Sequence, residues 1–145
     1  MQTRAFLAQD ALYDALKAAT FPGRVAVSLG SPTQLETDHI WVSGSIEEWP
    51  STYRVSGLAA RDEEFSLRVF VWVKRLGRFT DARARATALG SVVEQVILSD
   101  HTLDGTVDLA TLARTSLEDA VDQEARSYVC LLGFSIDCMA YIPNA

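Results

Sequence analysis

The chain opens with apolar residues at helical spacing. Over residues 6–19 they recur every three or four positions, whereas Asp10 and Asp14 fall on the other face. This pattern predicts an amphipathic helix, which we expect to end where Pro22 and Gly23 follow.

Alternation of apolar and polar residues then predicts strands. It is present at 24–29 and 39–44 and is strongest at 65–74, where every second residue is apolar. Pro50 interrupts residues 45–56, so we expect a strand there that is bent or broken at a sheet edge.

Between these strands, residues 57–64 predict an exposed hairpin loop, because they combine a glycine with four charged side chains. The charged residues are Arg61, Asp62, Glu63 and Glu64.

A second helix is predicted over 80–98, with Thr80 as its N-cap and Asp81 in its first turn. Gly90 inside it costs up to ~1 kcal/mol relative to alanine. It is either tolerated or allows another backbone to come close. A polar connection follows at 99–108.

The last third of the chain holds one ambiguous segment and one clear strand. Residues 109–121 fit a helix or a strand, and residues 126–142 fit a long strand. The order α-β-β-β(-β)-α-β-β predicts an α+β fold, an antiparallel β-sheet flanked by two α-helices. No repeat or linker divides residues 1–145, so we expect one domain.

Composition excludes several classes of protein. The 145 residues are 48% hydrophobic and carry a net charge of −6, which is typical of a soluble globular protein and argues against a basic nucleic-acid-binding surface. Two cysteines cannot build a disulfide scaffold, and the simplest interpretation is synthesis in a reducing cytoplasm. No apolar stretch approaches the ~20 residues of a membrane span.

The sequence contains no recognisable catalytic motif. Neither His39 nor His101 has a second ligand at metal-binding spacing. An enzyme would have to use His39 with Asp38, or Cys138 with Asp137. We therefore expect no enzyme, no cofactor and no metal site.

Charge is segregated along the chain. Residues 74–85 carry a net +4, whereas after residue 85 two basic residues face nine acidic ones. This pattern fits either a basic corner and a solvated acidic rim, or a head-to-tail contact between copies. Tryptophans opposite the main apolar stripes fit an interface or a second core layer. The candidate interface residues are Lys74, Arg75, Arg78, Arg83, Arg85, Trp41 and Trp72.

Four segments together resemble the tail terminator (tail completion) proteins of long-tailed bacteriophages, of the lambdoid type. They are ALYDALKAA with FPGRVAVSLG, the strand EEFSLRVFVWVKR, the helix DARARATALGSVVEQVI and the closing strand RSYVCLLGFSIDCMAYI. The likeness covers most of the chain and is one of length, element order and hydrophobic texture.

The resemblance implies a curved antiparallel sheet with residues 109–121 as a strand. It also implies a hexameric ring that caps the tail tube, stops tube polymerisation and presents its other face to the head–tail connector. The protein would then reside at the head–tail junction of the virion after assembly in the host cytoplasm. Its partners would be the tail tube protein and the connector protein.

DNA would pass through the ring without specific binding and with no membrane involved, which a net-negative chain suits. Arg61, Asp62, Glu63 and Glu64 would face the lumen or the tube. Two alternatives remain open: a small-ligand-binding or regulatory α+β domain, and a neighbouring head–tail connector adaptor.

Overall fold

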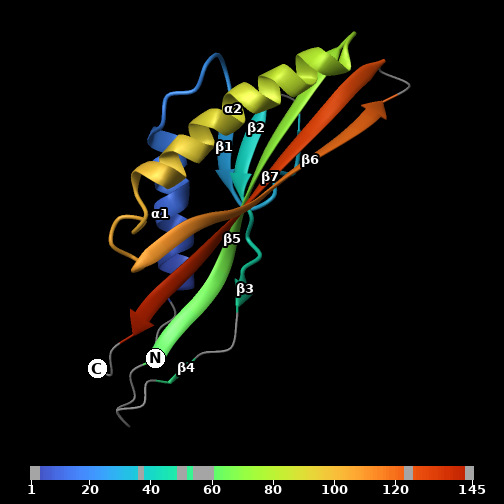
Figure 1. Ribbon diagram of the computed structural model, residues 1–145. Helices are drawn as coiled ribbons and strands as arrows, with labels where there is room; N and C mark the ends of the chain where they lie inside the picture. Colours follow the sequence, from blue (N-terminus) through green and yellow to red (C-terminus); the bar gives the residue numbers. More distant parts are fainter. Residues whose placement is uncertain (1–3, 36–37, 49–51, 54–60, 123–125, 143–145) are drawn as a thin grey trace.

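The structure, a computed structural model, confirms the α+β class and the order of helices and strands (Figure 1). It describes the chain except residues 1–3, 36–37, 49–51, 54–60, 123–125 and 143–145. The elements are α1 (Ala5–Ala18), β1 (Ala26–Leu29), β2 (His39–Val42), β3 (Glu47–Glu48), β4 (Thr52–Tyr53), β5 (Arg61–Leu76), α2 (Phe79–Ser99), β6 (Leu109–Asp122) and β7 (Ser127–Ile142).

The strands form one sheet in the order β1-β2-β5-β7-β6, with the short β3 and β4 also paired to β5. β5 and β7 are its centre, antiparallel from Arg61 opposite Ile142 to Leu76 opposite Ser127. The sheet differs from the prediction in one pair, because β1 and β2 run parallel. The connection between them, residues 30–38, returns the chain to the end of the sheet where β1 began.

Both helices cover the same face of the sheet. A single apolar core joins residues of α1 and α2 to one face of β2, β5 and β7, and in Figure 1 α2 lies across the long strands. The apolar alternation of β5 and β7 predicted which side chains are buried. The core side chains of these two strands include Phe65, Leu67, Val69, Val71, Val73, Cys130, Leu132, Phe134, Ile136 and Cys138.

Gly90 is where α2 comes closest to β7. A Cβ atom built there would collide with the Leu132 side chain and lie 3.3 Å from Cζ of Phe134. The groups that come close at this glycine are the side chains of Leu132 and Phe134, and not another backbone as the second interpretation had it.

The start of α2 differs slightly from the prediction. The helix begins at Phe79 with Arg78 as its N-cap, so Thr80 is not the cap. Asp81 does lie in the first turn, where its charge opposes the helix dipole.

The predicted loop at 57–64 is wrong over its second half. Arg61, Asp62, Glu63 and Glu64 belong to β5, because each continues the ladder with β7, and backbone pairing does not depend on side-chain charge. Glu63 is only 5% exposed, and its Oε1 accepts a hydrogen bond of 2.7 Å from the backbone N–H of Arg4 at the start of α1. Residues 57–60 lie outside the described part of the chain.

The ambiguous segment 109–121 is a strand, as the resemblance implied, and the helical alternative is wrong. β6 pairs with β7 from Leu109 opposite Met139 to Asp122 opposite Ser127. A bulge between Leu112 and Arg114 interrupts the regular alternation, which is why the sequence pattern did not favour the strand over the helix.

Candidate interaction surfaces

One end of the sheet extends beyond β2 and forms a three-stranded arm. β2 pairs with β5 only from Val69 to Trp72, so the last residues of β5, Val73–Leu76, have no described strand on that side. They continue to pair with β7, which pairs with β6. We call this part, residues 73–76, 117–122 and 127–132, the distal arm.

The outer side of β6 is one edge of the arm. Within the described residues no strand pairs with it, and every side chain described from Ala113 to Val121 is exposed. Leu117 and Val121 are 48% and 54% exposed, and Glu118 and Asp119 lie between them. An open strand edge is a template for another chain, and this one is acidic.

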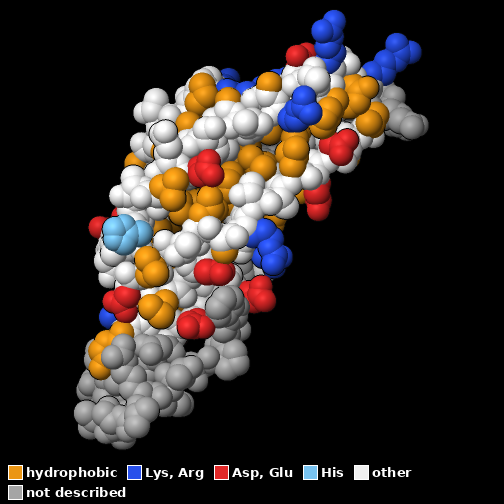
Figure 2. All heavy atoms as spheres, viewed as in Figure 1, with side chains coloured by type: hydrophobic (Ala, Val, Ile, Leu, Met, Phe, Trp, Pro, Cys, Tyr) orange, Lys and Arg blue, Asp and Glu red, His pale blue; other side chains and the backbone are white. Residues whose placement is uncertain are grey.

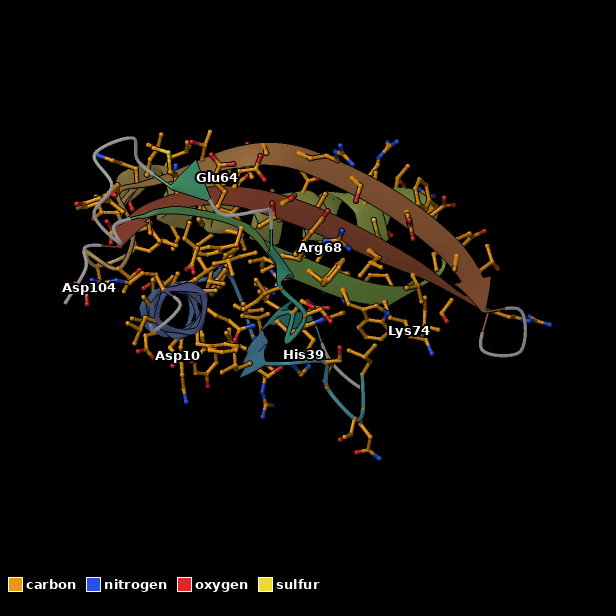
Figure 3. All side chains as sticks on the ribbon, turned by 90° about the horizontal axis from the view of Figure 1, so that it is seen from below. Asp10, His39, Glu64, Arg68, Lys74 and Asp104 are labelled. Carbon is orange, nitrogen blue, oxygen red and sulfur yellow. The ribbon has the colours of Figure 1, made fainter. Side chains whose placement is uncertain are left out.

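The opposite edge of the arm is basic. Lys74 lies near the end of β5, and Arg78 follows the turn at Gly77, whose φ of +96° favours glycine. Figure 3 shows Lys74 at the margin of the sheet opposite β6. In Figure 2, lysine and arginine side chains gather at the end of the molecule where α2 begins, beside an apolar strip.

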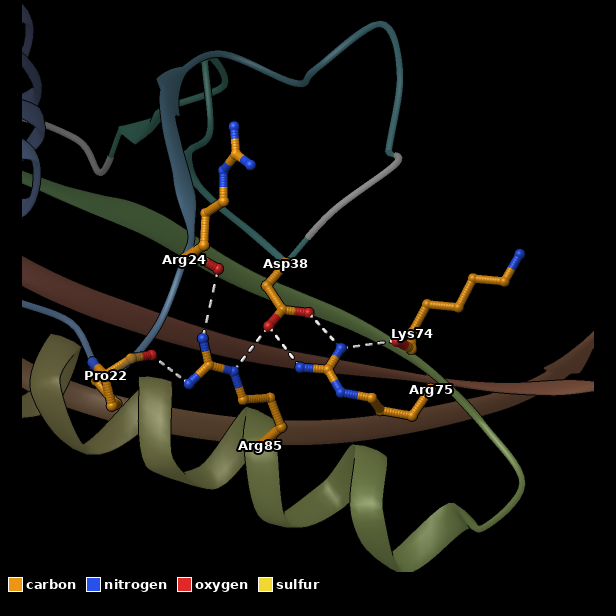
Figure 4. A network of polar contacts seen from close by, with 6 residues as sticks. All are labelled: Pro22, Arg24, Asp38, Lys74, Arg75 and Arg85. Carbon is orange, nitrogen blue, oxygen red and sulfur yellow. Dashed lines mark hydrogen bonds and ion pairs between the residues drawn. The ribbon is translucent and has the colours of Figure 1, made fainter.

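Two of the predicted interface arginines are held by hydrogen bonds to other parts of the same chain (Figure 4). Nη1 and Nη2 of Arg75 each donate to Asp38 at 2.7 Å, and Nε of Arg85 donates to the same carboxylate at 2.7 Å. Arg85 also donates to the carbonyl oxygens of Pro22 and Arg24. The cluster ties α2 to β5 and to the segments before β1 and β2, so its role is structural.

The remaining predicted interface residues differ in exposure. The guanidinium of Arg83 lies 5.5 Å from the ring centroid of Phe79 and is exposed at the start of α2. Trp41 is 9% exposed, and its ring lies 5.4 Å from that of Phe70, so it packs as part of a second, smaller apolar layer. Trp72 is partly buried beside it.

His39 and Cys138, the residues that an enzyme would have to use, have surroundings typical of structural residues. Nε2 of His39 lies 2.9 Å from Oγ of Ser28, burial lowers the pKa of this histidine, and Asp38 is occupied by arginines. Burial and, secondly, Asp137 raise the pKa of the Cys138 thiol to about 12. A nucleophilic cysteine needs the opposite shift.

A polar groove lies on the face of the sheet that faces away from α1 and α2. Its volume is about 550 Å³, and Figure 3 looks onto this face with Arg68 over the centre of the sheet. The lining residues come from β3, β5, β6 and β7 and include Glu47, Ser66, Arg68, Phe70, Arg114, Ser116, Gly133, Ser135 and Asp137.

The sequence analysis did not single out this groove. Arg68 and Arg114 are 46 positions apart, and the bulge that places the second one leaves no mark in the sequence. The one available signal was Gly133, a glycine inside a predicted strand, which often marks the close approach of another group.

Within the described residues no cluster of histidine, cysteine, aspartate or glutamate could hold a metal ion. In the same part of the chain, no helix has the length and apolarity needed to span a membrane.

Comparisons with known proteins found similarity among solved structures. No protein-family model matches the chain, and no curated protein matches its sequence. Among solved structures it is similar to a chain from the virion of a native gene transfer agent particle, with 16% sequence identity and a TM-score of 0.46. The match covers 91% of this chain and 94% of the other, but at that TM-score no function is carried over from it.

Proposed function

We propose that copies of this chain join head to tail through the two edges of the distal arm and close into a ring that serves as the tail terminator of a phage-like particle. The observation that carries the proposal is the opposite charge of the two open edges: β6 is acidic and the end of β5 is basic. On this proposal the chain acts by assembly and not by catalysis.

The geometry favours a head-to-tail contact over a symmetric one. Pairing β6 with β6 of a second copy would place Glu118 and Asp119 against identical charges, and like charges on facing strands are destabilising. Pairing β6 with the neighbour's β5 edge instead brings acidic residues to Lys74 and Arg78. Such a contact uses different surfaces on each copy, and it closes into a ring when the rotation per copy divides the circle.

The proposal that the ring caps a tail tube comes from the resemblance of the sequence to tail terminator proteins. A tail terminator presents one face of its ring to the tail tube and the other to the head–tail connector, and the resemblance implies six copies. A net charge of −6 per chain suits a lumen through which DNA passes without binding. A connector adaptor could use the same arm edges, so the choice of partner is part of the test.

Charge reversal on each edge tests the ring. One variant carries Glu118→Lys and Asp119→Lys, and the other carries Lys74→Glu and Arg78→Glu. We expect wild type to form rings beside tail tubes of the same particle, and neither variant to do so alone. Their mixture should recover rings, because each edge then meets an edge of opposite charge. Negative-stain electron microscopy and sedimentation velocity measure the outcome.

The matched control for the acidic edge is Glu94→Lys with Asp10→Lys on the exposed faces of the two helices, which changes the net charge as much as Glu118→Lys with Asp119→Lys does. It should assemble like wild type. Rings from both arm variants alone would refute the edge contact. Rings that leave tube length and tube ends unchanged would refute the terminator role, and rings that bind connectors instead would favour the adaptor.

A further inference from the structure

The groove on the helix-free face has a floor of small side chains along β7. Gly133 and Ser135 are successive residues of that face, with Phe70 and Ser116 as the cross-strand neighbours of Gly133. A Cβ atom at position 133 would lie 2.9 Å from Oγ of Ser116 and 3.4 Å from the Phe70 ring. Glycine weakens a strand interior, and here the missing side chain leaves room for the Ser116 and Phe70 side chains, which line the groove on either side of β7.

Two arginines face each other across this floor. Arg68 and Arg114 are both direct cross-strand neighbours of Ser135, one on β5 and one on β6. Direct neighbours share a face of the sheet, so both guanidinium groups belong to the same groove. Ser135 between them is too short to separate a ligand from either one.

The charges of these arginines are available to a ligand. Arg68 contacts Glu47 at 3.5 Å, with side chains 54% and 61% exposed, and exposed pairs of this kind are worth ~1 kcal/mol or less. Among the described residues, Arg114 forms no hydrogen bond or ion pair, and its side chain is exposed. A ligand anion can therefore replace weak contacts without breaking strong ones.

The β6 bulge sets the position of Arg114. Leu112 opposes Ile136 and packs against the core, whereas Arg114, two residues later, opposes Ser135 on the other face. In a regular strand, residues two apart share a face, so without the bulge this arginine would share the face of Leu112 and point toward the helices. Bulges of this kind often re-aim a side chain at a binding site.

We propose that this groove binds a short acidic segment of a partner protein, with one carboxylate held between Arg68 and Arg114. Arginine binds carboxylates through paired hydrogen bonds, and the partly buried Phe70 in the lining of the groove offers an apolar surface for a neighbour of that carboxylate. Glu47 and Asp137 also line the groove and balance the charge of the two arginines, so the groove suits a single carboxylate better than the closely spaced phosphates of a nucleic acid. The inference does not depend on the ring.

The test measures binding of a blocked tetraglutamate peptide by isothermal titration calorimetry. We expect wild-type protein to bind it, and Arg68→Gln or Arg114→Gln to weaken binding at least tenfold. Gly133→Ala should weaken peptide binding as well, because the added Cβ would displace the Ser116 and Phe70 side chains that line the groove. Arg24→Gln, an exposed arginine near α1, is the matched control and should bind as wild type does. Thermal melts of each variant show that the fold is intact.

Two further probes separate the alternatives. Tetraglutamine should not bind, and an eight-nucleotide oligothymidine should bind more weakly than tetraglutamate. Equal loss of affinity in Arg24→Gln would overturn the proposal, because binding would then follow net charge alone. Tighter binding of the oligonucleotide would reassign the groove to nucleic acid. Absence of tetraglutamate binding at millimolar concentration would refute it. Lys74→Glu with Arg78→Glu should leave peptide binding unchanged, which separates this result from failure of the ring.

Discussion

Asp38 is the residue on which the largest number of separate segments depend. Its side chain is 6% exposed and accepts charge-assisted hydrogen bonds from Arg75 on β5 and Arg85 on α2. Burial alone would raise the pKa of this carboxyl, but the hydrogen bonds from Arg75 and Arg85 outweigh burial and the pKa is lowered. The same contacts that remove two arginines from the predicted interface fix α2 to the sheet.

Asp38→Asn should lower the free energy of unfolding by about 2–3 kcal/mol, since hydrogen bonds to charged groups contribute about 1.5–3 kcal/mol and the two arginines lose their common partner. Urea unfolding followed by circular dichroism measures it. The control is Asp10→Asn on the exposed face of α1, which should change stability by less than about 0.5 kcal/mol. Equal effects of the two substitutions would contradict the assigned role.

The pH dependence of this effect has a defined sign. A carboxyl whose pKa is lowered by folding stabilises the protein fully above its ordinary pKa of 3.8, and the contribution is lost as pH falls through the lower folded value. The stability gap between wild type and Asp38→Asn should therefore be constant above about pH 5 and shrink below about pH 4. Urea titrations across this range measure the gap, and a gap that persists to pH 2 would disprove the linkage.

At the scale of elements, two local features set the position of the candidate interaction surfaces: the close packing of α2 on β7 and the bulge in β6. α2 can lie against β7 because Gly90 has no side chain, and the anchored helix leaves the β6 side of the arm uncovered. In β6, the bulge lets Leu112 face the core and Arg114 face the groove. Gly90 lowers the intrinsic stability of α2, and the bulge lowers that of β6, but each sets the position of a surface.

Gly90→Val should destabilise the fold by about 1–3 kcal/mol, because the added atoms overlap Leu132 in a packed core. Ala88→Val, on the exposed side of the same helix, tests the propensity effect alone and should cost less than about 0.7 kcal/mol. Thermal and urea unfolding measure both. A Gly90→Val variant as stable as wild type would mean that β7 can move away from the helix without cost.

At the scale of the whole molecule, the two margins of the distal arm carry opposite charges. The acidic β6 edge and the basic β5 edge lie on opposite margins of one arm, separated by β7. Opposite charges on opposite margins favour repeated head-to-tail contacts and disfavour symmetric dimers.

Assembly of the ring should therefore weaken with salt. The Debye length falls from about 10 Å at 0.1 M to about 3 Å at 1 M, which screens exposed charge pairs between edges. We expect the fraction of protein in rings beside tail tubes to fall several-fold between 0.1 and 1 M NaCl. Sedimentation velocity measures that fraction, and rings that persist unchanged at 1 M would show that apolar contacts at Leu117 and Val121 dominate.

The sequence by itself determined the elements whose periodicity is local. The helix predicted at 6–19 is α1, and the strand predicted at 65–74 is the middle of β5, because burial of one face leaves a repeat among residues close in the chain. It also named Lys74 and Arg78 as candidate interface residues, which stays a prediction that the proposed contact uses.

Only the tertiary structure decided the features that depend on distant partners. β6 is a strand because β7 pairs with it, and the Asp38 cluster joins residues 47 positions apart. The groove likewise needs Arg68, Gly133 and Arg114 on three strands in one register. Such juxtapositions follow from sheet order and bulge position, which are set by the packing of the whole chain and leave no local repeat in the sequence.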